Sequence, residues 1–207
     1  MRTHYYIICL LVRIGLKIFW RYKRIGAKHI PMTGGVIIAA NHAAYVDPPF
    51  IGSVCPRELF YLAKAELFSN ALFGKLLRKV NAIPINRGVF DRKAITQAIR
   101  LLKEGKALLF FPEGTRSRDG NFLEPKLGLG MIAREAGVPI IPAYISNSSN
   151  LLSSLLKRRR MIIGFDAPIS KDWLVLVPKS KDGYKIIGQE IMNHIGNLKV
   201  KIEKERF

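Results

Sequence analysis

VIIAANHAAYVDPP, residues 36–49, is the stretch that decides the fold. Residues 36–40 are apolar without alternation, and this pattern predicts a strand that is buried on both faces. Asn41 and His42 follow the run at once, and Asp47 precedes two prolines. We expect Asp47 to cap a helix whose first position is Pro48. The stretch therefore predicts a central strand that ends in polar side chains and leads into a helix.

A second stretch of the same kind is ALLFFPEGTRSRDG, residues 107–120. The apolar run 107–111 predicts another buried strand, and polar residues crowd the turn that follows it. In open α/β sheets, ligands bind beyond the carboxyl ends of the strands. If the two strands run parallel, the two polar turns face one crevice.

Apolar runs alternate with segments of helical spacing along the rest of the chain. Further strands are expected near residues 59–63, 81–85, 139–145 and 161–165, and helices near 69–80, 92–104, 127–136 and 183–205. This alternation predicts an α/β fold: a single layered domain with a largely parallel or mixed central sheet flanked by helices.

The composition predicts a folded domain with an anionic partner. The chain has 207 residues, of which 49% are hydrophobic and 24% charged, and these fractions exclude a disordered protein. The formal net charge of +19 indicates nucleic acid, an anionic membrane surface or a phosphorylated substrate as the partner. Cys9 and Cys55 have no metal-ligand spacing, so no metal site is expected.

The first 24 residues are apolar but interrupted by cations. A helix over residues 4–24 would place Arg13, Lys17, Arg21 and Arg24 on one stripe, with bulky apolar side chains over much of the rest. Such a helix lays its apolar side in the acyl region of a bilayer and its cations on anionic headgroups. We expect residues 1–28 to form an N-terminal amphipathic membrane-associating helix and residues 29–207 to form the main domain.

Two other interpretations of this segment remain open. One is a signal peptide, although no A-x-A-like cleavage site follows the apolar part and basic residues continue through it. The other is an ordinary helix that packs on the domain. The cationic turns that flank the segment favour the cytoplasmic face of the cell membrane as its location.

His42 and Asp47 have the chemistry of a base and the group that orients it. Residues five apart on a continuous helix point about 140° apart, but Pro48 disfavours helical backbone at Asp47, so a turn can bring the two together. The carboxylate would accept from one ring nitrogen and leave the other to take a proton. The alternative is structural: a histidine bonded to backbone at a strand end, and an aspartate that only caps a helix.

Arg87 and Arg116 are candidate anion binders, because a guanidinium forks onto a phosphate and keeps its charge. Gly114 permits close approach of the backbone to a ligand. A carboxylate beside a phosphate is repulsive, so we expect Glu113 to pair with an arginine or to accept from substrate hydroxyls. The alternative for each arginine is an ordinary surface residue of a basic chain.

Four blocks of sequence carry a resemblance to a known family. NHAAYVD (41–47) resembles the NHxxxxD motif of the glycerolipid acyltransferases, and FPEGTRS (111–117) resembles their FPEGTRS motif. AIPINR (82–87) and VPIIPAYI (138–145) are similar to two further blocks of the family, in the same order. The nearest subgroup is the 1-acylglycerol-3-phosphate acyltransferases, also called lysophosphatidate acyltransferases.

The resemblance implies a reaction, partners and site residues. Members of this subgroup transfer an acyl chain from an acyl thioester of acyl carrier protein or coenzyme A to the sn-2 hydroxyl of lysophosphatidate. The product is phosphatidate, and no acyl-enzyme intermediate forms. His42 would be the general base and Asp47 would orient it. No cofactor is implied besides the acyl donor as co-substrate, and residues 29–207 would be the acyltransferase domain. The residues that would hold the glycerol phosphate are Arg87, Glu113, Gly114, Thr115 and Arg116.

Other functions remain as alternatives. Within the same class, the acceptor would be another lysophospholipid or glycerol 3-phosphate. A non-enzymatic basic protein that binds nucleic acid or anionic lipid is supported by the charge, including KRRR at residues 157–160. That alternative gives no reason for two polar clusters at strand ends, and the chain has no nucleic-acid motif, so no nucleic-acid partner is expected.

Overall fold

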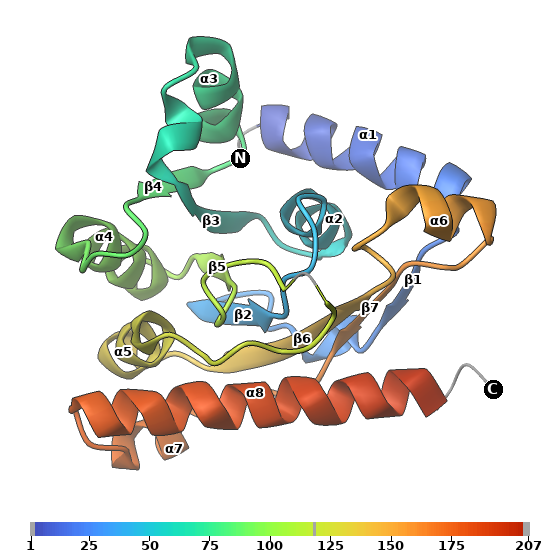
Figure 1. Ribbon diagram of the computed structural model, residues 1–207. Helices are drawn as coiled ribbons and strands as arrows, with labels where there is room; N and C mark the ends of the chain where they lie inside the picture. The colour runs from blue at the N-terminus through green and yellow to red at the C-terminus, as the bar shows by residue number, and fades with distance from the viewer. Residues whose placement is uncertain (1–2, 118, 205–207) are drawn as a thin grey trace.

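A mixed seven-stranded sheet forms the centre of the computed structural model, which describes residues 3–117 and 119–204 (Figure 1). The strand order is β1-β7-β6-β2-β5-β3-β4. The strands from β6 to β4 run parallel, whereas β7 is antiparallel to β6 and parallel to β1. Their bounds are β1 (Lys23–Ile25), β2 (Val36–Ala40), β3 (Leu59–Lys64), β4 (Ala82–Ile85), β5 (Ala107–Phe110), β6 (Ile140–Ser146) and β7 (Ile162–Phe165).

The α/β fold with a mixed sheet is thereby confirmed. The α-helices are α1 (Thr3–Trp20), α2 (Asp47–Val54), α3 (Ala71–Lys79), α4 (Arg92–Lys103), α5 (Leu127–Ala136), α6 (Leu151–Leu156), α7 (Lys171–Leu176) and α8 (Lys181–Lys204). Two 3₁₀ turns, η1 (Ala27–His29) and η2 (Ala65–Phe68), complete the elements. The sequence pattern does not predict β1, α6 or α7, because each has six residues or fewer and is too short to show a periodicity.

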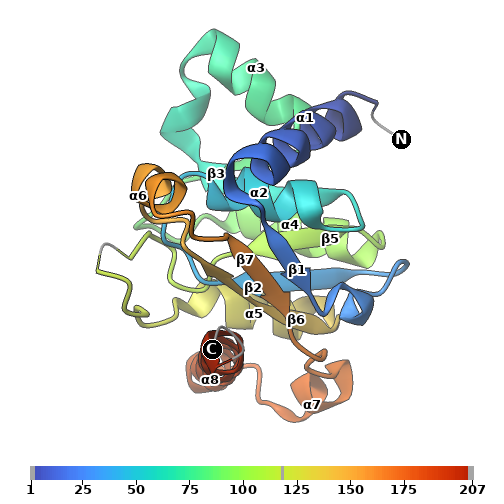
Figure 2. The same ribbon diagram turned by 90° about the vertical axis from the view of Figure 1, so that its right-hand side faces the viewer.

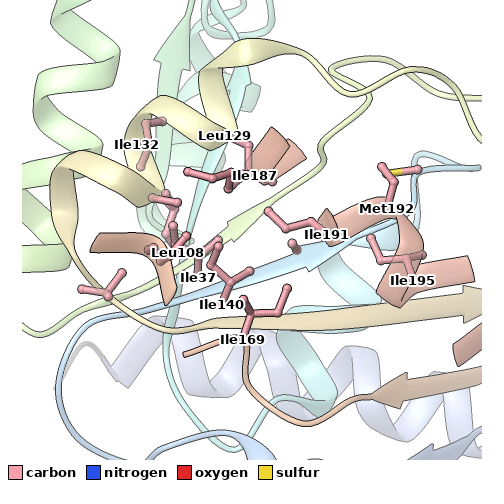
Figure 3. Packing of buried hydrophobic residues seen from close by; sticks show 14 of the residues in the cluster. Ile37, Leu108, Leu129, Ile132, Ile140, Ile169, Ile187, Ile191, Met192 and Ile195 are labelled. Carbon is pink, nitrogen blue, oxygen red and sulfur yellow. The ribbon is translucent and has the colours of Figure 1, made fainter. Parts of the chain in front are cut away.

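Helices cover both faces of the sheet, which is why the central strands lack alternation. Ile37 and Leu108 face α5 and α8, and Figure 3 shows them in the same cluster as Ile191. Ile38, the next residue on β2, points the other way, into the cluster that contains Phe50 of α2. In both views α1 and α2 lie on one side of the sheet and α7 and α8 on the other (Figures 1 and 2).

The N-terminal helix is shorter than expected. It ends at Trp20, so the expected single helix over residues 4–24 is wrong. Arg21 takes a left-handed backbone conformation with φ of 45°, and Arg24 lies in β1, which pairs with β7. Pairing in the sheet therefore ends the helix, and the expected stripe of four cations on one helix does not form.

Two of those cations instead cap α2. The Arg13 guanidinium donates to the carbonyl of Ser53 through Nε at 2.7 Å and also through Nη2, and Nη1 of Arg24 donates to the carbonyl of Val54 at 2.7 Å. The last carbonyls of a helix have no intrahelical partner, and the helix dipole makes them attractive to cations. Arg13 therefore faces the protein rather than a headgroup layer.

The side of α1 that faces away from the protein is apolar. Its exposed large apolar side chains are Tyr6, Ile7, Leu10, Leu11, Ile14, Ile18 and Phe19. Among the described residues, α1 is the one helix that is long and apolar enough to cross a membrane, by length and composition alone. The expected division into residues 1–28 and 29–207 stays a prediction.

Replacing Arg13 with methionine should lower the free energy of unfolding by about 1–2 kcal/mol, because the carbonyl of Ser53 in the last turn of α2 loses its charged partner while an apolar side chain is kept. Urea unfolding in a fixed detergent measures the change. The matched control is Lys17→Met on the exposed side of the same helix, which should change stability by less than about 0.5 kcal/mol. Equal losses in the two variants would contradict the capping role.

Candidate active site

His42 and Asp47 meet beyond the carboxyl end of β2. Nδ1 of His42 lies 2.9 Å from Oδ2 of Asp47. The same oxygen accepts from the backbone N–H groups of Ala43 and Ala44, each at 2.7 Å. Val46, not Asp47, is the N-cap of α2, so the expected capping role of Asp47 is wrong. Asp47 is the first residue of the helix, and Pro48 and Pro49 follow it in the first turn. The carboxylate of Asp47 turns back and closes the loop from His42.

This pairing sets the state of the imidazole ring. Asp47 is fully buried, and the backbone N–H groups of Ala43 and Ala44 and Nδ1 of His42 converge on one of its oxygens, an arrangement that suits a carboxylate. A carboxylate only accepts hydrogen bonds, so Nδ1 of His42 carries the proton that it shares with Asp47. Nε2 is then the ring nitrogen that can take a proton from another group.

Residues that follow β5 hold His42 from the other side. The Phe111 ring stacks on the imidazole with centroids 4.0 Å apart and planes 20° apart. The backbone N–H of Ser117 donates to the carbonyl of His42 at 2.8 Å. β2 and β5 are parallel neighbours, with Ala39 opposite Phe110. The two polar turns therefore face one edge of the sheet, as the sequence predicts.

Glu113 links the two turns through backbone groups. Its Oε1 accepts from the backbone N–H of His42 at 3.0 Å, and its Oε2 accepts from that of Leu123 at 2.9 Å. The residue is only 1% exposed, and this burial raises the pKa of its carboxyl, with a further rise from the charge of Asp47. These contacts differ from the expected pairing with an arginine or a substrate hydroxyl, and a direct substrate contact of Glu113 stays a prediction.

Arg87 and Arg116 bring positive charge to the same edge. The Arg116 guanidinium lies over the ring of Tyr45, with its central carbon 3.5 Å from the ring centroid. Arg87 follows β4, and its pKa is lowered first by partial desolvation and then by the positive charge of Arg116. An anion bound between these two guanidinium groups would offset their mutual repulsion, so the pair is a candidate anion-binding site.

The other two predicted residues belong to the same turn. Gly114 has a φ of 67°, a left-handed conformation that favours glycine, and this bends the chain between Glu113 and Arg116. Thr115 is exposed on that turn. A hollow of about 330 Å³ lies alongside, and its lining includes Ala43, Arg116 and Ser148. Within residues 3–117 and 119–204, no three His, Cys, Asp or Glu side chains gather as a metal site would require.

Three residues of the site are absent from the sequence-based set. Phe111 stacks on His42, and Tyr45 supports Arg116. Asn41 exchanges two hydrogen bonds with the backbone of Ile145 in β6, at 3.1 and 2.8 Å, and so fixes the strand end next to His42. Phe111 and Asn41 stand in the quoted motifs, but their partners come from distant parts of the chain, which residue spacing does not reveal.

Comparison with known proteins identifies the family. A family model described as Acyltransferase matches residues 21–146, more than half of the chain. The chain belongs to the Acyltransferase family. It is 29% identical over 198 residues to the 1-acyl-sn-glycerol-3-phosphate acyltransferase of Bacillus subtilis (strain 168), a match that covers 95% of this chain and 94% of the relative.

Two further matches extend this acyltransferase assignment. The crystal structure of the 1-acyl-sn-glycerophosphate (LPA) acyltransferase PlsC from Thermotoga maritima superposes with a TM-score of 0.71 at 26% identity, covering 93% of this chain and 78% of that one. A lyso-ornithine lipid O-acyltransferase of Pseudomonas aeruginosa is 39% identical over 109 residues, covering 52% of this chain and 41% of the relative. The expected family, fold and acyl-transfer activity are confirmed.

Proposed function

We propose that this acyltransferase moves an acyl chain from an acyl thioester to the sn-2 hydroxyl of lysophosphatidate and so makes phosphatidate. The observation that carries the proposal is the contact of 2.9 Å between His42 and Asp47, at the sheet edge that also holds the turn with Arg116. The relative from Bacillus subtilis, which matches 95% of this chain, supports the acceptor by its name.

His42 acts as the general base. Nε2 takes the proton of the acceptor hydroxyl as its oxygen attacks the carbonyl carbon of the thioester. A carbon–oxygen bond forms and the carbon–sulfur bond breaks. The proton then passes from Nε2 to the departing thiolate, which leaves as a thiol. Asp47 stabilises the imidazolium between these steps, and such base assistance contributes about 10²–10⁴ in rate.

Arg87 and Arg116 bind the phosphate of the acceptor, and Gly114 and Thr115 shape the turn beside it. The mutual repulsion of the two guanidinium groups supports this assignment, because a phosphomonoester between them neutralises both. Glu113 acts mainly by joining the turn to the backbone of His42. The donor is an acyl thioester of acyl carrier protein or coenzyme A, and neither a cofactor nor a metal takes part.

The enzyme works at an anionic membrane surface, on the cytoplasmic face of the cell membrane. The exposed apolar side of α1 supports this location, since its seven bulky side chains otherwise face water: Tyr6, Ile7, Leu10, Leu11, Ile14, Ile18 and Phe19. The lipid acceptor and the lipid product of the proposed reaction also reside in a bilayer.

A second candidate acceptor is another lysolipid. The relative that is named a lyso-ornithine lipid O-acyltransferase favours it, at 39% identity over 52% of this chain. The two arginines at the site favour the phosphomonoester instead. The two candidates differ in the headgroup that Arg116 would meet.

An activity panel of purified protein in mixed micelles tests the proposal. We expect transfer to lysophosphatidate to exceed transfer to lyso-ornithine lipid, monoacylglycerol and glycerol 3-phosphate, with the acyl thioester of coenzyme A or of acyl carrier protein as donor. Arg116→Ala should raise the KM for lysophosphatidate about 10- to 30-fold, since a charged hydrogen bond to the phosphate is lost, and should leave the KM for monoacylglycerol unchanged. Arg100→Ala, an exposed arginine of α4, is the matched control.

Two results would overturn the assignment. Absence of transfer to every acceptor with either donor would remove the proposed reaction. A preference for lyso-ornithine lipid that Arg116→Ala leaves intact would promote the second candidate.

A further inference from the structure

α6 presents an apolar face that no part of the described chain covers. Leu152 and Leu156 are 67% and 75% exposed and lie four residues apart, so they share one face of the helix. Ser154 is buried on the opposite side and donates to the carbonyl of Asn147. Ser154 and the partly buried Leu151, which packs against the core, hold the helix to the protein, and Leu152 and Leu156 face solvent.

This face continues onto α1. Nε1 of Trp20 donates to the carbonyl of Leu151 at 3.0 Å, and α6 packs against α1. Ile18 and Phe19, at the same end of α1, are 65% and 56% exposed. Both views place α1 and α6 on one side of the sheet and α7 and α8 on the other (Figures 1 and 2).

Four cations border the apolar surface. Lys157, Arg158, Arg159 and Arg160 follow α6 directly, and all four are exposed. No ion pair within the described part of the chain engages their side chains, and residues 137–165 contain no Asp or Glu. We call the surface formed by Ile18, Phe19, Leu152, Leu156 and residues 157–160 the α1–α6 face.

We propose that the α1–α6 face binds the surface of an anionic lipid bilayer, with the apolar side chains at the acyl boundary and residues 157–160 on the headgroups. An apolar patch bordered by unpaired cations matches that surface in both polarity and charge. A nucleic acid would engage the cations but would leave the four bulky apolar side chains in water. The inference rests on the proposed function for its acceptor, a lipid of the same bilayer.

The hollow beside the loop between His42 and Asp47 lies next to the α1–α6 face. Asn150 and Leu151, where α6 begins, line the hollow together with Ala43, Ala44 and Arg116. A bilayer on the α1–α6 face therefore lies next to the opening that leads toward Arg116. A lysolipid then reaches the site by moving sideways from the leaflet, with its acyl chain still in the bilayer.

Paired variants test the two halves of the face. Leu152→Ser/Leu156→Ser should weaken binding to phosphatidylglycerol vesicles about tenfold, through the loss of two apolar side chains. Lys157→Gln/Arg159→Gln/Arg160→Gln should weaken it about 30-fold and remove its dependence on the anionic lipid fraction. Arg158 is kept because its backbone is left-handed, with φ of 50°. Co-sedimentation measures binding, with phosphatidylcholine vesicles as the neutral comparison.

The matched control lies on the far side of the molecule. Val175 and Leu176 of α7 are 58% and 81% exposed, and Val175→Ser/Leu176→Ser should bind vesicles as the wild type does. Vesicle binding that survives in both the serine variant and the glutamine variant, or that falls equally in the α7 control, would overturn the inference. Salt-sensitive binding to duplex DNA that the glutamine variant loses and the serine variant keeps would overturn it in favour of nucleic acid.

Activity in two settings separates this inference from the proposed function. Transfer to lysophosphatidate in mixed micelles should be unchanged in the serine variant, because micelles supply the acceptor without a bilayer. Transfer to lysophosphatidate embedded in phosphatidylglycerol vesicles should fall about tenfold, in parallel with binding. If the wild type is inactive in micelles but the vesicle-binding differences appear, the proposed function fails and the bilayer contact stands.

Discussion

Replacing His42 with alanine should lower kcat by about 10²–10⁴-fold and leave the KM for lysophosphatidate nearly unchanged. The variant loses the nitrogen that takes the hydroxyl proton, while Arg87 and Arg116 keep their places beyond β4 and β5. Steady-state kinetics in mixed micelles, at saturating acyl thioester, measures both constants.

His194→Ala is the matched control, since His194 lies on α8 and pairs with Asp166 rather than with the site. Its kcat should equal that of the wild type. An equal kcat in His42→Ala would remove general-base catalysis by this residue. A large rise in KM with unchanged kcat would instead make His42 a binding residue.

The sequence predicts the part of the site that depends on neighbouring parallel strands, because such strands bring residues from distant segments to one edge of the sheet. Residues 36–40 and 107–110 are apolar throughout, and such runs form buried neighbouring strands whose ends must coincide. The contact between His42 and Asp47 is also local, within one loop that Pro48 closes. These features depend on short-range pattern and on the general geometry of parallel sheets.

The features that the sequence does not predict depend on contacts between distant segments. A helical wheel puts Arg13 on a cationic stripe, but it cannot show that the carbonyl end of α2 lies beside it. The backbone turn at Arg21 is equally hidden, because β1 is three residues long and exists only through its pairing with β7. The same limit hides the backbone partners of Glu113, since Leu123 lies in a segment without regular periodicity.

Replacing Glu113 with glutamine should lower kcat about 100-fold with little change in the KM for lysophosphatidate. A carboxylate accepts at both oxygens, whereas glutamine has one acceptor and places an NH₂ group against the backbone N–H of His42 or Leu123. A buried donor then loses its partner, and the loop that carries His42 shifts. A displacement of about 1 Å at a reacting group costs about 100-fold in rate.

Glu124→Gln makes the same change at an exposed carboxylate one residue from Leu123, and its kinetics should match the wild type. A rise in KM for lysophosphatidate in Glu113→Gln, with kcat preserved, would contradict the positioning role and support the substrate contact that the sequence predicts. A kcat equal to that of the wild type would show that the link between the two turns is dispensable.

The pH dependence of stability provides an independent measure of the Glu113 environment. Burial raises the pKa of this carboxyl, so between the ordinary glutamate value and the raised value the native state binds more protons than the unfolded state. The free energy of unfolding of the wild type therefore decreases as pH rises through that interval, and this contribution is absent in Glu113→Gln. The stability advantage of the wild type over the variant should be largest at low pH and shrink as the carboxyl ionises. If the stability advantage of the wild type instead grows with pH, the hydrogen bonds from His42 and Leu123 stabilise the carboxylate more than burial destabilises it. The native state would then favour the ionised form of Glu113.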